Sequence, residues 1–144
     1  MPNPDHYAKL ERMYLSAPIN EYFRPEIKIS HGKAEITMIV RDDFFHAAHG
    51  VHGAVYFKAL DDAAYFAASS LVFDVFILTV SYTTYFTRQI SQGVMHSIGE
   101  VVHNSRRIMI AESQLLDSKG HVLARGSGTF MRSRITLDAS VGYL

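Results

Sequence analysis

Apolar and polar residues alternate with several different periods along the chain, and each change of period marks an expected element. Residues 4–16 have the spacing of a short amphipathic helix, and residues 27–40 alternate as strands around a turn at Gly32. Pro18 and Pro25 lie between these two segments. Because proline disrupts regular backbone hydrogen bonding, they predict an irregular connection between the helix and the first strand.

Residues 53–71 are rich in Ala and Leu, contain few β-branched residues and include no proline, which favours a helix. On a helical wheel the polar side chains form one narrow stripe, made of Lys58, Asp62, Tyr65 and Ser69. Apolar residues cover most of the remaining circumference. A helix of this kind is normally buried.

After this helix the period changes to two, which is typical of strands. Four strand-like runs follow, over residues 74–86, 93–104, 107–117 and 121–134. The connections between them are short and of hairpin type. One long helix wrapped by a single curved antiparallel sheet fits this order best, so the fold class is α+β. We expect residues 1–144 to form a single domain.

The composition narrows the classes of function open to this domain. The chain has 14 Lys and Arg against 14 Asp and Glu, so it lacks the basic excess of a non-specific nucleic-acid binder. It has no cysteine, which excludes disulfides, thiolate-bound zinc and a thiol nucleophile. Its most apolar stretch is far shorter than the roughly 20 residues that span a bilayer, and its N-terminus lacks the apolar core of a signal peptide. We expect a cytoplasmic protein that binds neither nucleic acid nor membrane.

Two adjacent carboxylates, Asp61 and Asp62, lie in the middle of the predicted buried helix. Asp62 belongs to the polar stripe and follows Lys58 by one turn, so an i,i+4 ion pair accounts for it. Asp61 lies at the edge of the apolar surface and has no such partner. A carboxylate placed there has a raised pKa and is a candidate general base or nucleophile; a structural hydrogen bond to a neighbouring strand is the alternative.

The start of the same helix carries a second candidate for catalysis. Gly53 begins it, and a glycine at a helix N-terminus lets a ligand approach the free backbone N–H groups. His46, His49 and His52 precede it with a spacing that suits a metal only in a helical segment, and Gly50 argues against a helix there. We expect these histidines to cap the helix or to hydrogen-bond the site, without a metal.

The sequence resembles the PaaI-like branch of the hotdog-fold acyl-CoA thioesterases. The motif His52-Gly53-Ala54 stands where that family has a His-Gly-Gly helix start, spanning residues 49–54, and Asp61 follows nine residues after the His. The match continues through the strand ILTVSYTTYF, the stretch VVHNSRRI and the closing ARGSGTFM. Hotdog proteins consist of one long helix in a curved antiparallel sheet, which is also the arrangement that the periodicity indicates.

The resemblance implies a role for each matching residue. The Gly53 backbone N–H polarises the thioester carbonyl, and Asp61 acts as nucleophile or as general base on water. Thr79 matches a Ser or Thr that helps to place this water, and His52 matches the His at the helix start. His46 departs from the pattern, because the family usually has Asn or Gln there. The resemblance implies no cofactor.

The spacing of Gly53 and Asp61 constrains the assembly. Eight residues span about 12 Å along a helix axis, so the two groups cannot both reach one carbonyl if they belong to one helix. The amide and the carboxylate of a site should therefore come from two chains related by a two-fold axis. We expect a homodimer, or a homotetramer made of two such dimers.

An acyl-CoA substrate adds expectations about binding. Its phosphates need cationic groups near the surface. The candidates are Arg106 and Arg107, followed by Arg125, Arg132 and Arg134. The acyl group needs an apolar pocket, and the candidates to line it are the aromatic residues Tyr56, Phe57, Tyr82 and Tyr85.

Two other classes of function stay open on the sequence alone. A hotdog-fold hydratase or dehydratase acting on acyl thioesters would pair Asp61 with His46 or His49 as acid and base. A non-catalytic acyl-CoA-binding protein would hold Asp61 in a structural contact. Release of a free thiol from an acyl-CoA distinguishes hydrolysis from both.

Overall fold

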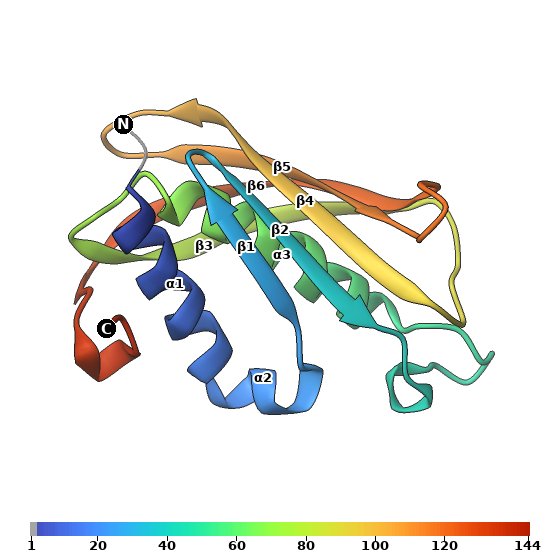
Figure 1. Cartoon of the computed structure of the whole chain (residues 1–144). Coiled ribbons are helices and arrows are strands. Elements are labelled where there is room, and N and C mark those ends of the chain that lie inside the picture. The colour runs from blue at the N-terminus through green and yellow to red at the C-terminus, as the bar shows by residue number, and fades with distance from the viewer. Residues whose placement is uncertain (1–2) are drawn as a thin grey trace.

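The computed structural model describes residues 3–144, and there a six-stranded antiparallel sheet curves around one long helix (Figure 1). The helices are α1 (Pro4–Ser16), α2 (Pro18–Phe23) and α3 (Gly53–Ser69), with short 3₁₀ helices η1 (Asp42–Phe44) and η2 (Ala139–Val141). The strands are β1 (Glu26–Ser30), β2 (Lys33–Ile39), β3 (Val75–Phe86), β4 (Val94–Asn104), β5 (Met109–Leu116) and β6 (Val122–Thr136). The predicted α+β class and hotdog architecture are confirmed.

The strand order is β1-β2-β4-β5-β6-β3, which leaves β3 at one edge. The pairs β4–β5 and β5–β6 are hairpins, as predicted. The expected hairpin between β3 and β4 is wrong, because β3 pairs with β6 instead. Residues 87–93 run past the start of α3, where the Ile90 carbonyl accepts a hydrogen bond from the Val51 N–H (2.9 Å). The length of a connection does not determine which strands pair.

The irregular connection predicted around Pro18 is also wrong, because residues 18–23 form the short helix α2. Pro18 occupies the first turn of α2, where proline is tolerated since that backbone nitrogen has no helical partner. The helix ends at Phe23, and Arg24 caps it in a left-handed conformation (φ 51°). Pro25 follows and cannot continue the helix.

The helix α3 lies very close to the middle of the sheet. A β-carbon at Gly99 of β4 would lie 2.3 Å from the Ala63 carbonyl oxygen, so only glycine admits the helix at this distance. Ser113 of β5 donates a hydrogen bond to the Leu60 carbonyl of α3 (2.8 Å). Small residues on both elements therefore fix the height and rotation of α3 over the sheet.

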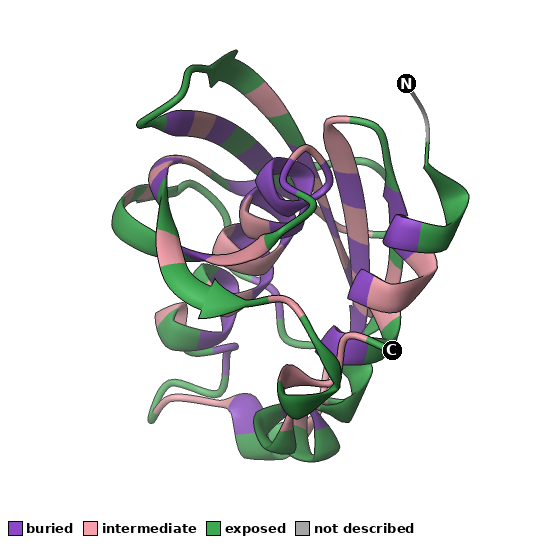
Figure 2. Ribbon diagram, turned by 90° about the vertical axis from the view of Figure 1, so that its left-hand side faces the viewer, coloured by how far each residue is buried: buried purple, intermediate pink, exposed green. Residues whose placement is uncertain are grey.

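Burial follows the predicted period of two along β2 and β5, whereas most of the edge strand β3 is exposed. Along β2 and β5 alternate residues are buried against α3, and most of α3 is itself buried (Figure 2). Phe57 of α3 is an exception, with 40% of its surface exposed beside β3. Among residues 3–144, no helix has both the length and the apolar character required to cross a bilayer.

Replacing Gly99 by Ala tests the close contact of α3 with the sheet. The added methyl group collides with helix backbone rather than with a flexible side chain, so we expect a loss of about 2–4 kcal/mol in the free energy of unfolding. Glu100→Ala, on the exposed side of the same strand, is the matched control and should change it by no more than about 0.5 kcal/mol. If urea denaturation gives Gly99→Ala the same free energy of unfolding as the Glu100→Ala control, this account of the contact is wrong.

Candidate functional site

Asp61 lies in the middle of α3, half-buried and facing β3. Its Oδ1 accepts a hydrogen bond from the Thr79 hydroxyl of β3 (3.0 Å). Burial, followed by the neighbouring negative charge of Asp62, raises the pKa of Asp61 to about 6, although the Thr79 hydrogen bond and the Lys58 charge act in the opposite direction. Asp61 is therefore a carboxylate poised to exchange a proton close to neutral pH.

Asp62 has the opposite surroundings, although it is the next residue. Its Oδ2 accepts from the Lys58 ammonium group at 2.6 Å and from the Tyr14 hydroxyl at 2.7 Å. The predicted ion pair of Lys58 and Asp62 is confirmed. Both carboxylates line the same cleft. Since both partners of Asp62 are donors and one is cationic, its charge is compensated within the protein, whereas Asp61 accepts from the neutral Thr79 hydroxyl.

The cleft beside Asp61, called the acidic cleft below, has a volume of about 330 Å³. Its walls come from α1, α2, α3, β3 and the C-terminal η2. The apolar side chains among its lining residues are Met13, Ala17, Ile19, Phe66, Phe76, Ile77, Leu78 and Val141. Asn20 also lines it, and the buried Asn20 Oδ1 has no hydrogen-bond partner in the described part of the chain.

A second cleft, of about 390 Å³, lies at the start of α3 and is called the amide cleft below. The predicted capping role of His52 is confirmed, because its Nδ1 accepts from the Ala54 N–H (2.9 Å). The preceding N–H, that of Gly53, has no protein acceptor among residues 3–144. The lining residues are His46, Val51, Gly53, Tyr56, Phe86, Thr87, Arg88 and Gln89.

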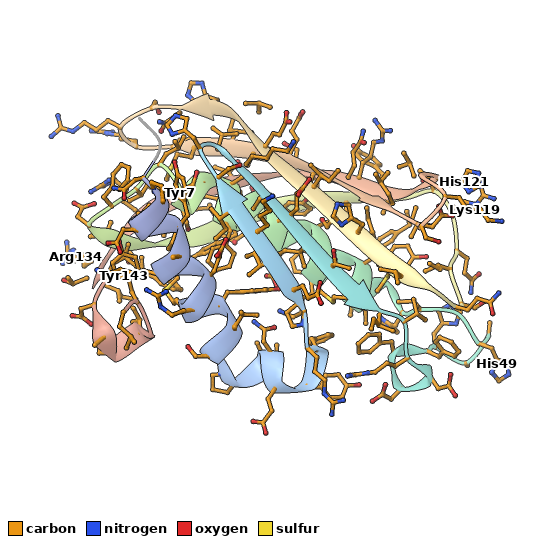
Figure 3. All side chains as sticks on the ribbon, in the orientation of Figure 1. Tyr7, His49, Lys119, His121, Arg134 and Tyr143 are labelled. Carbon is orange, nitrogen blue, oxygen red and sulfur yellow. The ribbon has the colours of Figure 1, made fainter. Side chains whose placement is uncertain are left out.

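The three histidines do not converge. His46 reaches the Gln89 side chain (3.1 Å), His52 caps α3, and His49 points away from the molecule (Figure 3). His49 has a left-handed backbone (φ 65°). Nowhere between residues 3 and 144 do three His, Asp or Glu side chains form a group that could hold a metal ion.

The two clefts share no lining residue in one protomer. Gly53 and Asp61 both belong to the regular helix α3, so about 12 Å separates them along its axis. A single protomer therefore presents a carboxylate with its hydroxyl partner in one place and a free backbone amide in another.

The cationic candidates lie apart from both clefts. Arg106 and Arg107 occupy the turn between β4 and β5, and Arg132 is bound to Asp74 by two hydrogen bonds of 2.6 and 2.7 Å. Arg88 lines the amide cleft but was not among the cationic residues predicted from the sequence. No local pattern singles it out, because only the path of residues 87–93 past the helix start brings it there.

The aromatic candidates also lie outside the acidic cleft. Tyr56 lines the amide cleft, where its hydroxyl donates to the Arg88 carbonyl (2.8 Å) and accepts from the Ile90 N–H (3.0 Å). Tyr82 hydrogen-bonds Ser113 beneath α3. The apolar walls of the acidic cleft come instead from α3, β3, η2 and the N-terminal segment, which contributes Met13, Ala17 and Ile19. No sequence pattern indicated that the N-terminal segment has a role at the site.

Comparisons with known proteins agree with this architecture. The sequence profile of the thioesterase superfamily matches residues 49–124, more than half of the chain. That segment includes Gly53, Asp61 and Thr79. No curated protein matches the chain significantly.

Solved structures resemble the whole fold. The Escherichia coli PaaI protein, from the phenylacetic acid degradation operon, is 18% identical and superimposes with a TM-score of 0.84 over 92% of this chain and 96% of its own. A thioesterase family protein from Silicibacter pomeroyi is 23% identical, with a TM-score of 0.79 over 87% and 96%. A conserved protein from Pseudomonas aeruginosa is 22% identical, with a TM-score of 0.79 over 85% and 98%. At these identities the likeness concerns the fold alone.

The raised pKa of Asp61 gives a prediction about stability. The folded state holds the proton of Asp61 up to about pH 6, whereas the unfolded chain releases it near pH 4. Ionised Asp61 therefore destabilises the fold above about pH 6, and the effect disappears below about pH 4. Asp61→Asn should raise the free energy of unfolding by about 1–2 kcal/mol at pH 7, after allowance for solvent screening. Denaturant unfolding curves of the wild type and of Asp61→Asn at pH 7.5 and pH 3.5 measure this difference in free energy.

Asp62→Asn is the matched control for that experiment, because it removes the same charge one residue away. It weakens the contacts with Lys58 and Tyr14, so it should lower the stability at pH 7 by about 1–3 kcal/mol. A stabilising Asp62→Asn together with a destabilising Asp61→Asn would contradict the electrostatic assignment of the pair.

Proposed function

The chain belongs to the thioesterase superfamily, and from this membership we propose that it hydrolyses an acyl-CoA thioester to a free acid and coenzyme A. One observation carries the proposal. Asp61 is a half-buried carboxylate with a pKa of about 6 that faces a cleft and has one hydroxyl partner, Thr79. Such a group is suited to take a proton from water or to attack a carbonyl at neutral pH.

In the general-base route, Asp61 takes a proton from a water molecule held with Thr79, and the water oxygen attacks the thioester carbonyl carbon. The carbonyl oxygen becomes an oxyanion, which the free Gly53 N–H stabilises. The C–S bond then breaks, and the thiolate of coenzyme A leaves and takes up a proton. In the nucleophilic route, an Asp61 oxygen attacks the carbonyl carbon, the C–S bond breaks and the thiolate of coenzyme A leaves and takes up a proton. Water then hydrolyses the mixed anhydride to the free acid and the Asp61 carboxylate.

Both routes need the amide and acidic clefts at one carbonyl, and the edge strand β3 offers a way to bring them together. Thr79 of β3 contacts Asp61, while Phe86 of β3 lies 3.2 Å from where a β-carbon of Gly53 would be. If two β3 strands pair antiparallel about a two-fold axis between Tyr82 and Thr83, Thr79 lies opposite the partner's Phe86. The Asp61 of one chain then approaches the Gly53 of the other.

The surface around β3 is suited to such an isologous interface. Its exposed large apolar residues are Phe57, Leu78, Val80, Tyr85 and Phe86. A long apolar edge strand is prone to unspecific pairing unless it is covered. Pairing of β3 with a second copy of the chain would satisfy its free backbone groups and bury these side chains together.

The acidic cleft is the proposed acyl site. Its volume of about 330 Å³ lies at the lower end of the range for small-molecule sites, which suits a short, medium-length or single-ring acyl group. The phenylacetic acid operon of the E. coli neighbour makes phenylacetyl-CoA a reasonable first substrate. The unpaired Asn20 Oδ1 would favour acyl groups that carry a hydroxyl group, since a buried acceptor without a partner is unfavourable.

Two observations favour hydrolysis over the alternatives. A hydratase would pair Asp61 with an imidazole. Among residues 3–144 of one protomer no histidine lines the acidic cleft, and His46, which lines the amide cleft, has both ring nitrogens engaged, by the Ala48 N–H and by the Gln89 side chain. A purely binding role would leave Asp61 in a structural contact, but its hydrogen bond to Thr79 is exposed beside a cleft.

Asp61→Asn should lower kcat by at least about 10²-fold, because it removes a positioned base or nucleophile. Asp62→Asn should have a much smaller effect, because the Asp62 Oδ2 already accepts hydrogen bonds from Lys58 and Tyr14 and is not free to take a proton from water. In the wild type, the rate should rise with pH through an apparent pKa near 6, as Asp61 ionises. The two kcat values and the pH dependence are measured by the release of free coenzyme A thiol. The substrates are acyl-CoAs of increasing chain length, with and without a hydroxyl group on the acyl chain. The opposite ranking of the two variants would contradict the proposed function.

Complementation between inactive chains tests the shared site. Gly53→Pro removes the free N–H at a helix position where proline is accepted, and Asp61→Asn removes the carboxylate. A mixed dimer of the two variants has one site with both defects and one intact site. At random exchange half of the dimers are mixed, so about a quarter of the wild-type activity per site should return.

Mass spectrometry provides the control for that experiment, because it shows whether the subunits have exchanged. A mixture that contains the mixed dimer and still lacks activity would contradict the shared site. Each variant alone should form dimers of wild-type mass, since neither substitution alters the exposed apolar residues of β3.

A further inference from the structure

Gln89 lies in the amide cleft, although nothing in the sequence pattern singles it out. It belongs to the connection between β3 and β4, and its side-chain amide lies 3.1 Å from Nε2 of His46. Both side chains line the cleft that contains Gly53. An oxyanion is normally stabilised by more than one donor.

The tautomer of His46 decides how the Gln89 amide is oriented. Nδ1 of His46 accepts a hydrogen bond from the Ala48 N–H (3.0 Å), so this nitrogen carries no proton. The neutral ring therefore has its hydrogen on Nε2, which faces Gln89 as a donor. Oxygen and nitrogen of an amide are assigned from their hydrogen bonds. The Gln89 Oε1 must consequently face His46, which leaves the NH₂ group free to donate elsewhere.

The backbone on both sides of Gln89 is held in place. Tyr56 donates to the Arg88 carbonyl and accepts from the Ile90 N–H, and the Ile90 carbonyl accepts from the Val51 N–H (2.9 Å). These three bonds attach residues 88–90 to α3 and to the segment that precedes it. The Gln89 side chain therefore extends from a fixed point, which reduces the entropy lost when it contacts a ligand.

Gly50 provides the space for this arrangement. A β-carbon at Gly50 would lie 1.7 Å from the Gln89 amide atom that faces His46 and 2.6 Å from the amide carbon. Any larger residue would therefore displace the Gln89 amide. Two features, a glycine beneath the amide and a histidine that fixes its oxygen, hold one exposed side chain in one orientation.

We infer that the Gln89 side-chain NH₂ is a second donor to the thioester carbonyl oxygen, beside the Gly53 N–H, and that His46 is the positioning residue that directs it. This inference rests on the proposed thioester hydrolysis. The group that Gln89 would bind is the thioester carbonyl oxygen as it becomes an oxyanion. A neutral amide can donate a hydrogen bond to this oxyanion without adding charge to the cleft.

Gln89→Glu is the most informative variant. Glutamate keeps the size of the side chain and an acceptor for the Nε2–H of His46, but it has no proton to donate at neutral pH. We expect kcat to fall at least about 10²-fold, with an unchanged midpoint of unfolding, because the side chain of Gln89 is exposed. Gln92→Glu makes the same charge change at an exposed position of the same connection and should keep wild-type kcat.

A double-mutant cycle tests the positioning role of His46. His46→Leu alone should lower kcat, because the Gln89 amide loses its fixed orientation. In the Gln89→Glu background the same substitution should cost much less, because the donor is already absent. Additive losses would overturn the positioning role of His46.

A binding measurement separates this inference from the proposed function. In ¹⁵N-labelled protein, an unreactive ketone analogue of the acyl-CoA should shift the side-chain amide resonance of Gln89, identified by its loss in Gln89→Glu, and leave that of Gln92 unchanged. If Asp61→Asn abolishes hydrolysis while Gln89→Glu retains wild-type kcat and the Gln89 resonance does not move, the inference is wrong and the proposed function stands. If the wild type hydrolyses no acyl-CoA, both are wrong.

Discussion

The close contact between α3 and the sheet is the constraint on which the positions of the candidate site residues depend. Glycine at position 99 lets the backbone of α3 approach β4 more closely than a side chain would allow, and the hydrogen bond from Ser113 to the Leu60 carbonyl fixes the helix against β5. Because the height and rotation of the helix are then set, each of its side chains has a determined direction. Asp61 faces β3, Asp62 faces α1, and Gly53 begins the helix beside residues 87–93.

The pair Asp61 and Asp62 illustrates how neighbouring residues acquire different properties from one helix orientation. Successive helical residues lie about 100° apart around the axis. This rotation places Asp62 between Lys58 and Tyr14, which donate two hydrogen bonds to it. Asp61 receives one hydrogen bond, from Thr79, and its pKa is raised by burial and by the charge of Asp62. The structural carboxylate thus helps to tune the reactive one.

The edge strand β3 and the connection that follows it link the fold to the proposed chemistry. β3 contributes Thr79 to the acidic cleft and Phe86 to the amide cleft, and it leaves its outer edge unpaired in one protomer. Residues 87–93 then pass the start of α3 and bring Arg88 and Gln89 to the amide cleft. A conventional hairpin between β3 and β4 would have taken both residues away from it.

The sequence by itself determined the fold class, the long buried helix, the hairpins β4–β5 and β5–β6 and the unusual position of Asp61. These features follow from local periodicity, because helix and strand repeats record which side of each element is buried. The pairing of β3 with β6, the N-terminal helices that line the acidic cleft, and the contact of His46 with Gln89 were decided only by the tertiary structure. In each case the residues in contact are far apart along the chain, and no local period encodes where a connection passes or which elements it brings together.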